Sequence, residues 1–406
     1  MKYFNYITQV WYAEMHQVLH NFGLIIFSIL VPLAYPLLYT FVYTNETVRE
    51  VPVAIVDECH SNMSREFARK VDACSEVEVL YHCDVAQAQE LMRREKIYAY
   101  LLIPSSFDKD IAKGRQTYIG LYSDMRCMLY YKAALLSATN VSLEMNADIK
   151  TNNYLRPTTD RQAEIMKAPV TNSYVPLYNP QSGVASFLIP AVLMLIIQQL
   201  LFLSIGTSMG ITREKNGGSG IPSDNPYFRN PLCIVIGKAL FYVPLFMLIA
   251  LYMYAGVTDW FSLLSLGDYA TFLAFIFPYV LACTLMGISM SAFLYRSEDP
   301  MLLYIFMSVP LLFLSGMSWP VAAEPMFWRY VSWLFPSSFG THAYARIMGT
   351  GATLHEVAFE WKGLWIQCAV YGVTAIMVYW HELRRIKDTH FLRHKQGFLC
   401  FFCDYF

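Results

Sequence analysis

Charged side chains are scarce in this chain of 406 residues, since Asp, Glu, Lys and Arg together make up only 15% of it. In soluble domains, charged residues make up about 25% of the sequence on average. The shortage is uneven, because several long stretches carry almost no charge whereas residues 46–167 carry a normal share. This unevenness predicts membrane spans that alternate with a water-soluble part. The net charge of −1 supplies no overall field that would attract nucleic acid, and we predict no nucleic-acid partner.

Catalytic and nucleotide-binding motifs are also missing. A P-loop needs glycines that cradle phosphates, followed by Gly-Lys-Ser/Thr. The glycine-rich stretch 216–220 lacks this ending, and Gly237 and Lys238 are followed by alanine. His355 and Glu356 lack the second histidine of a zinc-protease helix. We therefore predict that the chain is not an enzyme, that it has no catalytic residues and no metal site, and that it binds no cofactor of its own.

Long apolar segments account for much of the remaining sequence. A helix needs about 20 apolar residues to cross the hydrocarbon core of a bilayer, and six segments of that kind contain no Asp, Glu, Lys or Arg. The predicted fold class is an α-helical polytopic membrane protein with six transmembrane helices, embedded in a lipid bilayer. The segments lie within residues 19–45, 170–212 (its apolar part 184–210), 239–258, 269–295, 300–323 and 363–381.

These segments divide the chain into predicted parts. Between helices two and three lies a cytoplasmic loop, residues 211–232, and between helices five and six lies an outer segment, residues 319–362. The parts are an interfacial helix (1–21), transmembrane helix 1 (22–44), an extracytoplasmic α/β domain (45–180), transmembrane helices 2–6 (181–381) and a cytoplasmic tail (382–406).

Lys and Arg are distributed asymmetrically among the connecting segments. The tail carries five of them and the 211–232 loop three, whereas the short loop 259–268 carries none. The positive-inside rule then places both termini in the cytoplasm and residues 45–180 outside.

The first 21 residues are predicted to form an amphipathic helix that lies in the inner membrane interface. A plain cytoplasmic extension of the first span is the alternative. The predicted apolar face comprises Phe4, Ile7, Trp11, Met15 and Val18, while Asn5, Gln9, Glu14 and Gln17 lie elsewhere around the helix.

Strand and helix patterns alternate in the extracytoplasmic part, which predicts a small α/β domain. Valine-rich and other apolar runs predict strands, and stretches of strong helix formers predict helices. A polar, proline-punctuated segment over residues 150–179 is predicted to return to the membrane in extended form. The predicted strands are 51–57, 77–80, 99–103 and 119–122, and the predicted helices are 64–71 with Ser64 as a possible N-cap, 85–96 and 128–149.

The order of these parts resembles the membrane subunits of ABC-2 type exporters, in the class with a large periplasmic insertion after the first helix. The resemblance covers almost the whole chain. Four local patterns carry it, namely residues 53–57 with Ser64 following, Tyr178-Asn179-Pro180 before the second span, Arg213-Glu214-Lys215 leading through Pro231 to Gly237-Lys238, and Ser315-Gly316 leading through Pro320, Pro325 and Pro336 to Arg346. The 211–232 loop departs from the family, which usually has Glu-x-Glu and then Gly-Thr.

The resemblance implies a division of labour. A separate ABC ATPase subunit would bind ATP and magnesium, and Arg213, Glu214 and Lys215 would contact it, the alternative being that they are ordinary positive-inside charges on a connector. A second permease copy or a related permease would complete the translocation path. A periplasmic adaptor and an outer-membrane channel are further partners that such exporters use. The expected location is the bacterial cytoplasmic (inner) membrane. The substrate stays open.

Polar and helix-breaking residues within the spans are candidates for a translocation path or gate. Gln198 and Gln199 are the most polar residues of the second span, and the alternative for them is hydrogen bonding between helices. Ser315, Gly316 and Pro320 interrupt the fifth span before its outer end. A rival hypothesis for the whole chain is a non-transporting receptor or scaffold that binds through its extracytoplasmic domain.

Cysteine leaves two questions open. Four cysteines lie in the predicted outside domain and could form two disulfides in three connectivities. Two histidines and two cysteines near the end have spacing that could hold zinc, although an unstructured end is the expected alternative. The outside cysteines are Cys59, Cys74, Cys83 and Cys127, and the terminal residues are His390, His394, Cys400 and Cys403.

Overall fold

The computed structural model of the chain describes residues 2–43, 48–151, 184–222, 227–263, 265–316 and 323–403. For residues 2, 184, 185, 187 and 386–403 it describes the backbone only. The chain divides into two compact units. We call residues 47–175 the α/β unit, and residues 1–46 with 176–406 the helical unit.

The α/β unit contains a four-stranded mixed sheet in the order β2-β1-β3-β4. Its strands are β1 (Val51–Asp57), β2 (Val77–His82), β3 (Ala99–Ile103) and β4 (Gly120–Ser123). The central strand β1 runs parallel to β2 and β3, and β4 runs antiparallel to β3. All four predicted strands are present, with their ends shifted by at most two residues.

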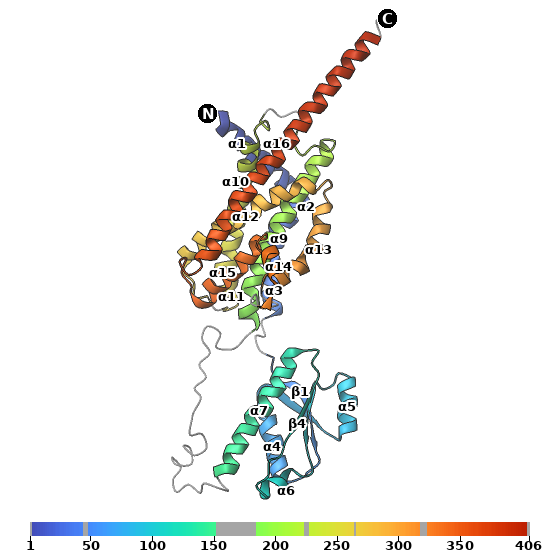
Figure 1. Cartoon of the computed structure of the whole chain (residues 1–406), viewed down its shortest axis with the longest axis vertical. Helices are drawn as coiled ribbons and strands as arrows, with labels where there is room; N and C mark the ends of the chain where they lie inside the picture. The colour runs from blue at the N-terminus through green and yellow to red at the C-terminus, as the bar shows by residue number, and fades with distance from the viewer. Residues whose placement is uncertain are drawn as a thin grey trace. The chain divides into compact units, whose positions relative to one another are not determined.

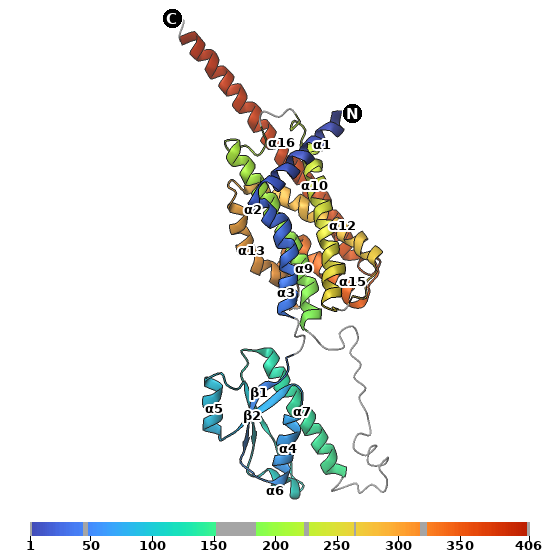
Figure 2. The same ribbon diagram turned by 180° about the vertical axis from the view of Figure 1, so that it is seen from behind.

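Helices cover both faces of this sheet (Figures 1 and 2). On one face, α4 (Asn62–Asp72) and α7 (Met128–Lys150) bury Phe67, Val71, Val141 and other apolar side chains against the strands. On the other face, α5 (Val85–Arg93) covers a smaller cluster. A short helix that the sequence did not predict, α6 (Phe107–Ala112), follows β3. The four cysteines of this unit are free thiols.

The first helix of the α/β unit begins earlier than predicted, and Ser64 is not its cap. The Ser61 hydroxyl accepts a hydrogen bond from the Ser64 backbone N–H at 3.0 Å, and the Ser64 hydroxyl accepts one from the Ser61 N–H at 2.9 Å. This reciprocal capping box satisfies two N–H groups that a helix start leaves unpaired. Ser64 also donates to the carboxylate of Asp57 at 2.7 Å, which ties the helix to the end of β1.

The helical unit contains five helices in the described residues that are long and apolar enough to cross a membrane. The first span, Phe22–Val42, is built from α2 (Phe22–Ile25), the π-helical turn η1 (Ile26–Leu30) and α3 (Val31–Val42). The others are α9 (Val184–Lys215), α10 (Pro231–Leu251) continued by η3 (Tyr252–Val257) and α11 (Thr258–Trp260), α12 (Tyr269–Met290) followed by the turn η4 (Ser291–Phe293), and α16 (Ala358–Cys403).

The predicted fifth span is shorter than expected. The helix α13 (Asp299–Leu314) has 16 residues, which at 1.5 Å per residue is about 24 Å, less than the hydrocarbon core of about 30 Å. At its end the Ser315 hydroxyl donates a hydrogen bond to the Leu312 carbonyl, and Gly316 takes a left-handed φ of 74°. Pro320 and the rest of 317–322 lie outside the described residues. Six spans therefore remain a prediction.

The predicted outer segment contains two helices, α14 (Met326–Ser332) and α15 (Pro336–Thr350). Helix α15 is largely buried and packs against α9, α12 and α16. Tyr279 of α12 lies so close to Gly340 of α15 that an added Cβ would come within 2.4 Å of its ring. Helix α15 is thus part of the helical packing, whereas most of α14 is exposed.

The N-terminal helix α1 (Lys2–His20) is present, but its packed face is rotated from the predicted one and overlaps it only in part, at the buried Val18 and the half-buried Ile7, Trp11 and Met15. The buried side chains are Val10, Glu14 and Val18, at a spacing of four residues, whereas Phe4 of the predicted apolar face is 70% exposed. The last span also differs, because α16 continues without a break through the predicted tail to Cys403 (red in Figure 1). The four candidate zinc ligands there have side chains outside the described residues.

Candidate functional site

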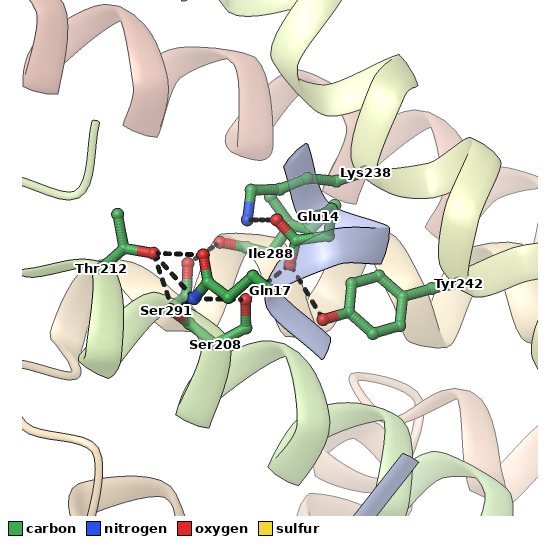
Figure 3. A network of polar contacts seen from close by, with 8 residues as sticks. All are labelled: Glu14, Gln17, Ser208, Thr212, Lys238, Tyr242, Ile288 and Ser291. Carbon is green, nitrogen blue, oxygen red and sulfur yellow. Dashed lines mark hydrogen bonds and ion pairs between the residues drawn. The ribbon is translucent and has the colours of Figure 1, made fainter. Parts of the chain in front are cut away.

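A buried polar network joins α1 to two spans (Figure 3). Its centre is Glu14 of α1, whose carboxylate pairs with the Lys238 ammonium of α10 at 2.6 Å. The same carboxylate accepts hydrogen bonds from the Ser208 hydroxyl of α9 at 2.6 Å and the Tyr242 hydroxyl of α10 at 2.9 Å. Both charged side chains are about 5% exposed. One carboxylate therefore holds three helices together.

A second side chain of α1 extends the network one turn further. The Gln17 amide donates to the Ser208 carbonyl at 2.7 Å and to the Thr212 hydroxyl at 3.1 Å. Gln17 and Glu14 thus contact neighbouring turns of α9 from the same side of α1 (Figure 3). The helix is fixed in register along α9 as well as across it.

Gly237 allows α1 and α10 to pack closely against each other. A Cβ at this position would lie 2.7 Å from Val10 and 3.0 Å from the Ile7 carbonyl. The backbones of α1 and α10 can approach this closely only because the side chain is absent. The next residue is Lys238, so one dipeptide supplies both the close approach and the buried cation.

The charge state of the pair follows from its surroundings. Burial by itself raises the pKa of the Glu14 carboxyl, but Lys238 and the hydrogen bonds from Ser208 and Tyr242 outweigh it and hold this pKa below its ordinary value. Glu14 is therefore ionised at neutral pH. An isolated buried charge is costly, so the pair stabilises this arrangement only while both partners are present.

Arg213, which follows Ser208 by five residues on α9, forms a second buried ion pair. Its guanidinium pairs with Glu382 of α16 and is 2% exposed. It also donates to the carbonyl oxygens of Ser291, at 3.0 Å, and Leu294 in the turn after α12. The sequence predicted that Arg213 contacts a partner, but in this structure both terminal nitrogens of its guanidinium bond inside the chain, and its buried Nε has no hydrogen-bond partner among the described residues.

Glu214 and Lys215 lie at the exposed end of α9. The Glu214 carboxylate accepts hydrogen bonds from the backbone N–H of Ser297 at 2.8 Å and from its hydroxyl at 2.9 Å. This ties α9 to the turn that precedes α13. The turn lies against Gly210, where an added Cβ would meet the Arg296 carbonyl at 2.4 Å. Of the three predicted contact residues, two are thus accessible.

The predicted path residues lie elsewhere along α9 and at the end of α13. Gln198 is buried, and its side-chain oxygen accepts a hydrogen bond from the Ser337 backbone N–H at 2.6 Å. A hydrogen bond between helices was the alternative to a place for Gln198 in the translocation path, and this bond is one. Gln199 is half-buried beside an apolar pocket. Ser315 is buried, and its carbonyl accepts a hydrogen bond from Thr341 of α15 at 3.1 Å.

Sequence reasoning missed the partners in both buried clusters, among them Glu14, Lys238 and Tyr242 in the first and Glu382 in the second. Lys238 lies within the third span, but a search for segments without charge begins that span at Ala239. A lone lysine within an otherwise apolar helix was the available signal, since such a residue is expected to find a partner. Glu14 was assigned to the polar face of α1 without one.

The α/β unit has a polar groove of its own, about 1100 Å³ in volume, along α4 and the carboxyl ends of β1 and β2. Arg65, Arg69, His82 and Asp84 line it. Ligands commonly bind outside the carboxyl ends of parallel strands. In the described residues of both units, no group of three or more His, Cys, Asp or Glu side chains is placed to hold a metal ion.

Residues 22–377 match a family model described as ABC-2 family transporter protein. No curated protein matches the chain. The match includes Ser208, Arg213 and Lys238 but ends short of Glu14 and Glu382. Both carboxylates that neutralise the buried cations therefore come from segments that the family model does not cover.

Proposed function

This chain belongs to the ABC-2 transporter family, and from that premise we propose that it is the membrane-spanning subunit of an ATP-driven exporter. Family membership makes it a multi-pass membrane component of an ABC transporter that works with an ABC ATPase subunit. Outward direction, use of ATP and magnesium by that partner, and location in a bacterial inner membrane with both termini in the cytoplasm are our proposals.

The observation that carries this proposal is the way the end of α9 is held. Glu214 and Lys215 are exposed, and directly behind them the Arg213–Glu382 ion pair fixes α9 to α16. The Ser208 hydroxyl of α9 also donates a hydrogen bond to Glu14, which pairs with Lys238 between α1 and α10. A push on this end would move several helices together, because breaking a buried pair costs about 3–5 kcal/mol. Such a stiff charged end suits a subunit that receives force from an ATPase.

A complete exporter needs more than this chain. We propose that a second copy or a related permease completes the path, and that an adaptor and an outer-membrane channel are optional further partners. Residues 45–180 would then lie outside. Ser315 and Gly316, which end α13 beneath α15, are our candidates for a gate.

Glu214→Arg tests the coupling role. We expect it to abolish substrate-stimulated ATP hydrolysis by the complex purified in mild detergent and to weaken co-purification of the ATPase, because it reverses the charge at the exposed end. Loss of one desolvated charged contact costs about 2–5 kcal/mol, and less at an exposed rim.

Glu356→Arg is the matched control. Glu356 is also exposed, and its carboxylate accepts hydrogen bonds from the backbone N–H and hydroxyl of Thr353 just as Glu214 does from Ser297. It precedes α16, on the predicted outer side. If both variants keep wild-type ATP hydrolysis and co-purification, the end of α9 is only a connector and the coupling role is wrong.

The rival role, a receptor or scaffold, has one feature in its favour, the polar groove of the α/β unit. The two roles differ in the partner they need. A chain that never co-purifies with a P-loop ATPase, yet binds a polar ligand through this groove, would favour the receptor.

A further inference from the structure

A pocket of about 260 Å³ lies where α14, α15 and the start of α16 meet. A cavity of about 150 Å³ holds one benzene molecule, so this pocket has room for a somewhat larger group. Aromatic rings and ionisable side chains line it together. It belongs to the segment that the sequence places on the outer side, and neither of the buried ion pairs described above contributes to it.

Three aromatic rings from three successive helices form much of the lining. Trp333 directly follows α14, Phe339 lies in α15 and Phe359 lies in the first turn of α16. The ring centroid of Phe359 is 6.1 Å from those of both other rings. Trp333 and Phe359 are 41% and 64% exposed, so much of each ring is free of protein contact. The faces of such rings are electron-rich and attract a cation within about 6 Å.

Glu360 adds a negative charge that the chain compensates only in part. Its Oε1 lies 3.6 Å from the Arg346 guanidinium, which is too far for a hydrogen bond. Its Oε2 is buried and has no hydrogen-bond partner among the described residues. The residue lies in the first turn of α16, where the helix dipole favours a negative charge. This carboxylate therefore acts on a ligand through its charge rather than through a hydrogen bond.

Two other ionisable side chains line the pocket. Burial lowers the pKa of His342 more than the nearby Glu360 raises it, so the imidazole is neutral at neutral pH. Arg329 is exposed, and Glu324 is close enough to act as its counter-charge. Neither side chain adds an uncompensated positive charge that would repel a cation.

We propose that this pocket binds a quaternary ammonium group, with its methyl groups against Trp333, Phe339 and Phe359 and its charge offset by Glu360. A primary ammonium would give up its hydrogen bonds to water and would need acceptors in their place. A quaternary ammonium donates no hydrogen bond, and aromatic rings are its usual binding partners. The group belongs either to a soluble compound such as choline or to the headgroup of a choline lipid. Its binding does not depend on the proposed function.

Choline and its neutral isostere 3,3-dimethylbutan-1-ol, in which carbon replaces the ammonium nitrogen, test the proposal. Full-length protein is purified in a maltoside detergent, which contains no choline, and each compound is titrated into it by calorimetry. The two compounds have nearly the same shape, so they differ in the charge alone. We expect choline to bind at least about ten-fold more tightly, as cation–π contacts in a partly desolvated site would give.

Two pairs of variants locate the site. Phe359→Leu removes one ring of the lining and should weaken choline binding about five-fold, whereas Phe327→Leu, which changes a 68% exposed ring of α14 outside the lining, should leave it unchanged. Glu360→Gln keeps the shape but removes the charge, and it should weaken the binding of choline and not that of the isostere. Glu356→Gln is its control. Because Phe359 is largely exposed, Phe359→Leu decides the question if Glu360→Gln does not fold.

Nanodiscs distinguish the two sources of the group. Equal choline binding in phosphatidylglycerol and phosphatidylcholine nanodiscs identifies a soluble ligand, and choline binding that is lost only in phosphatidylcholine identifies the lipid headgroup. Either result keeps the site. Absence of choline binding in detergent, equal affinity for choline and the isostere, or a preference for choline that survives both Phe359→Leu and Glu360→Gln overturns the proposal. Because no ATPase takes part, these results stand whether or not the chain exports anything.

Discussion

Glu14 and Lys238 are the residues on which the position of α1 depends most. They are 224 positions apart in the chain, and each is buried with its charge directed at the other. The hydroxyls of Ser208 and Tyr242 accompany them, so the carboxylate is both paired and hydrogen-bonded. Removing one partner is expected to do more harm than removing both.

Lys238→Met keeps a long apolar side chain but leaves Glu14 buried without its counter-charge. We expect a loss of about 3–5 kcal/mol in the free energy of unfolding. The double variant Glu14→Gln with Lys238→Met should recover most of it, since an amide oxygen can still accept the two hydroxyl hydrogen bonds. Thermal unfolding in detergent measures both, with the exposed Lys362→Met of α16 as control. Equal stability of the single and double variants would refute the pairing argument.

At this scale the sequence predicted residue types better than residue partners. Gln198 was a candidate for the translocation path with hydrogen bonding between helices as the alternative, and it does accept a hydrogen bond from Ser337. Arg213 was identified as important, but its partner Glu382 lies 169 positions away. Pairs that distant depend on how the helices pack, which a single sequence does not specify. For this reason Arg213 was expected to be exposed, whereas in the structure its side chain is buried.

At the scale of elements, the contact between α1 and α10 is set by Gly237. This glycine was part of the pattern that suggested the family, but nothing in the sequence indicated what it contacts. The packed face of α1 was predicted only in part, because hydrophobicity alone selected the exposed Phe4 together with the buried Val18 and left out Glu14. Because Glu14 pairs with the buried Lys238, the face of α1 that carries this charged residue packs against α10.

Gly237→Ala tests this contact. The added methyl group would meet Val10 at 2.7 Å, and overpacking of this kind costs about 1–3 kcal/mol, against a gain of at most about 1 kcal/mol in helix propensity. Gly349→Ala is the control, since nothing lies within 4 Å of its added group in α15. We expect a lower unfolding temperature for Gly237→Ala and an equal or higher one for Gly349→Ala. Similar shifts in both would show that α1 does not lie against α10.

The lengths of elements were predictable where composition changes sharply. The strands of the α/β unit and the helix α7 were found within two residues, because valine-rich runs and strong helix formers have clear limits. Helix α13 was overestimated, since residues 300–323 are apolar throughout and only the left-handed turn at Gly316 ends the helix. Helix α16 was underestimated, because charge after residue 381 ends an apolar span without ending a helix.

For the whole molecule, composition was the most informative property. The uneven charge predicted a helical membrane part and an α/β part, and the chain does divide into two such units. The family resemblance, resting on four short patterns, is confirmed by the match over residues 22–377. Glu14 and Glu382 lie outside that match. The family model therefore does not contain both partners of either buried ion pair, and the pairs were identified from the structure.

The most direct test of the account is cross-linking from the end of α9 in native membranes. Lys215 is replaced by the photo-cross-linking residue p-benzoylphenylalanine, and so, in a second chain, is Tyr118 of the α/β unit, which is 72% exposed. We predict that position 215 cross-links to a P-loop ATPase and that position 118 does not. An ATPase adduct from position 118 and none from position 215 would contradict both the proposed orientation and the coupling role.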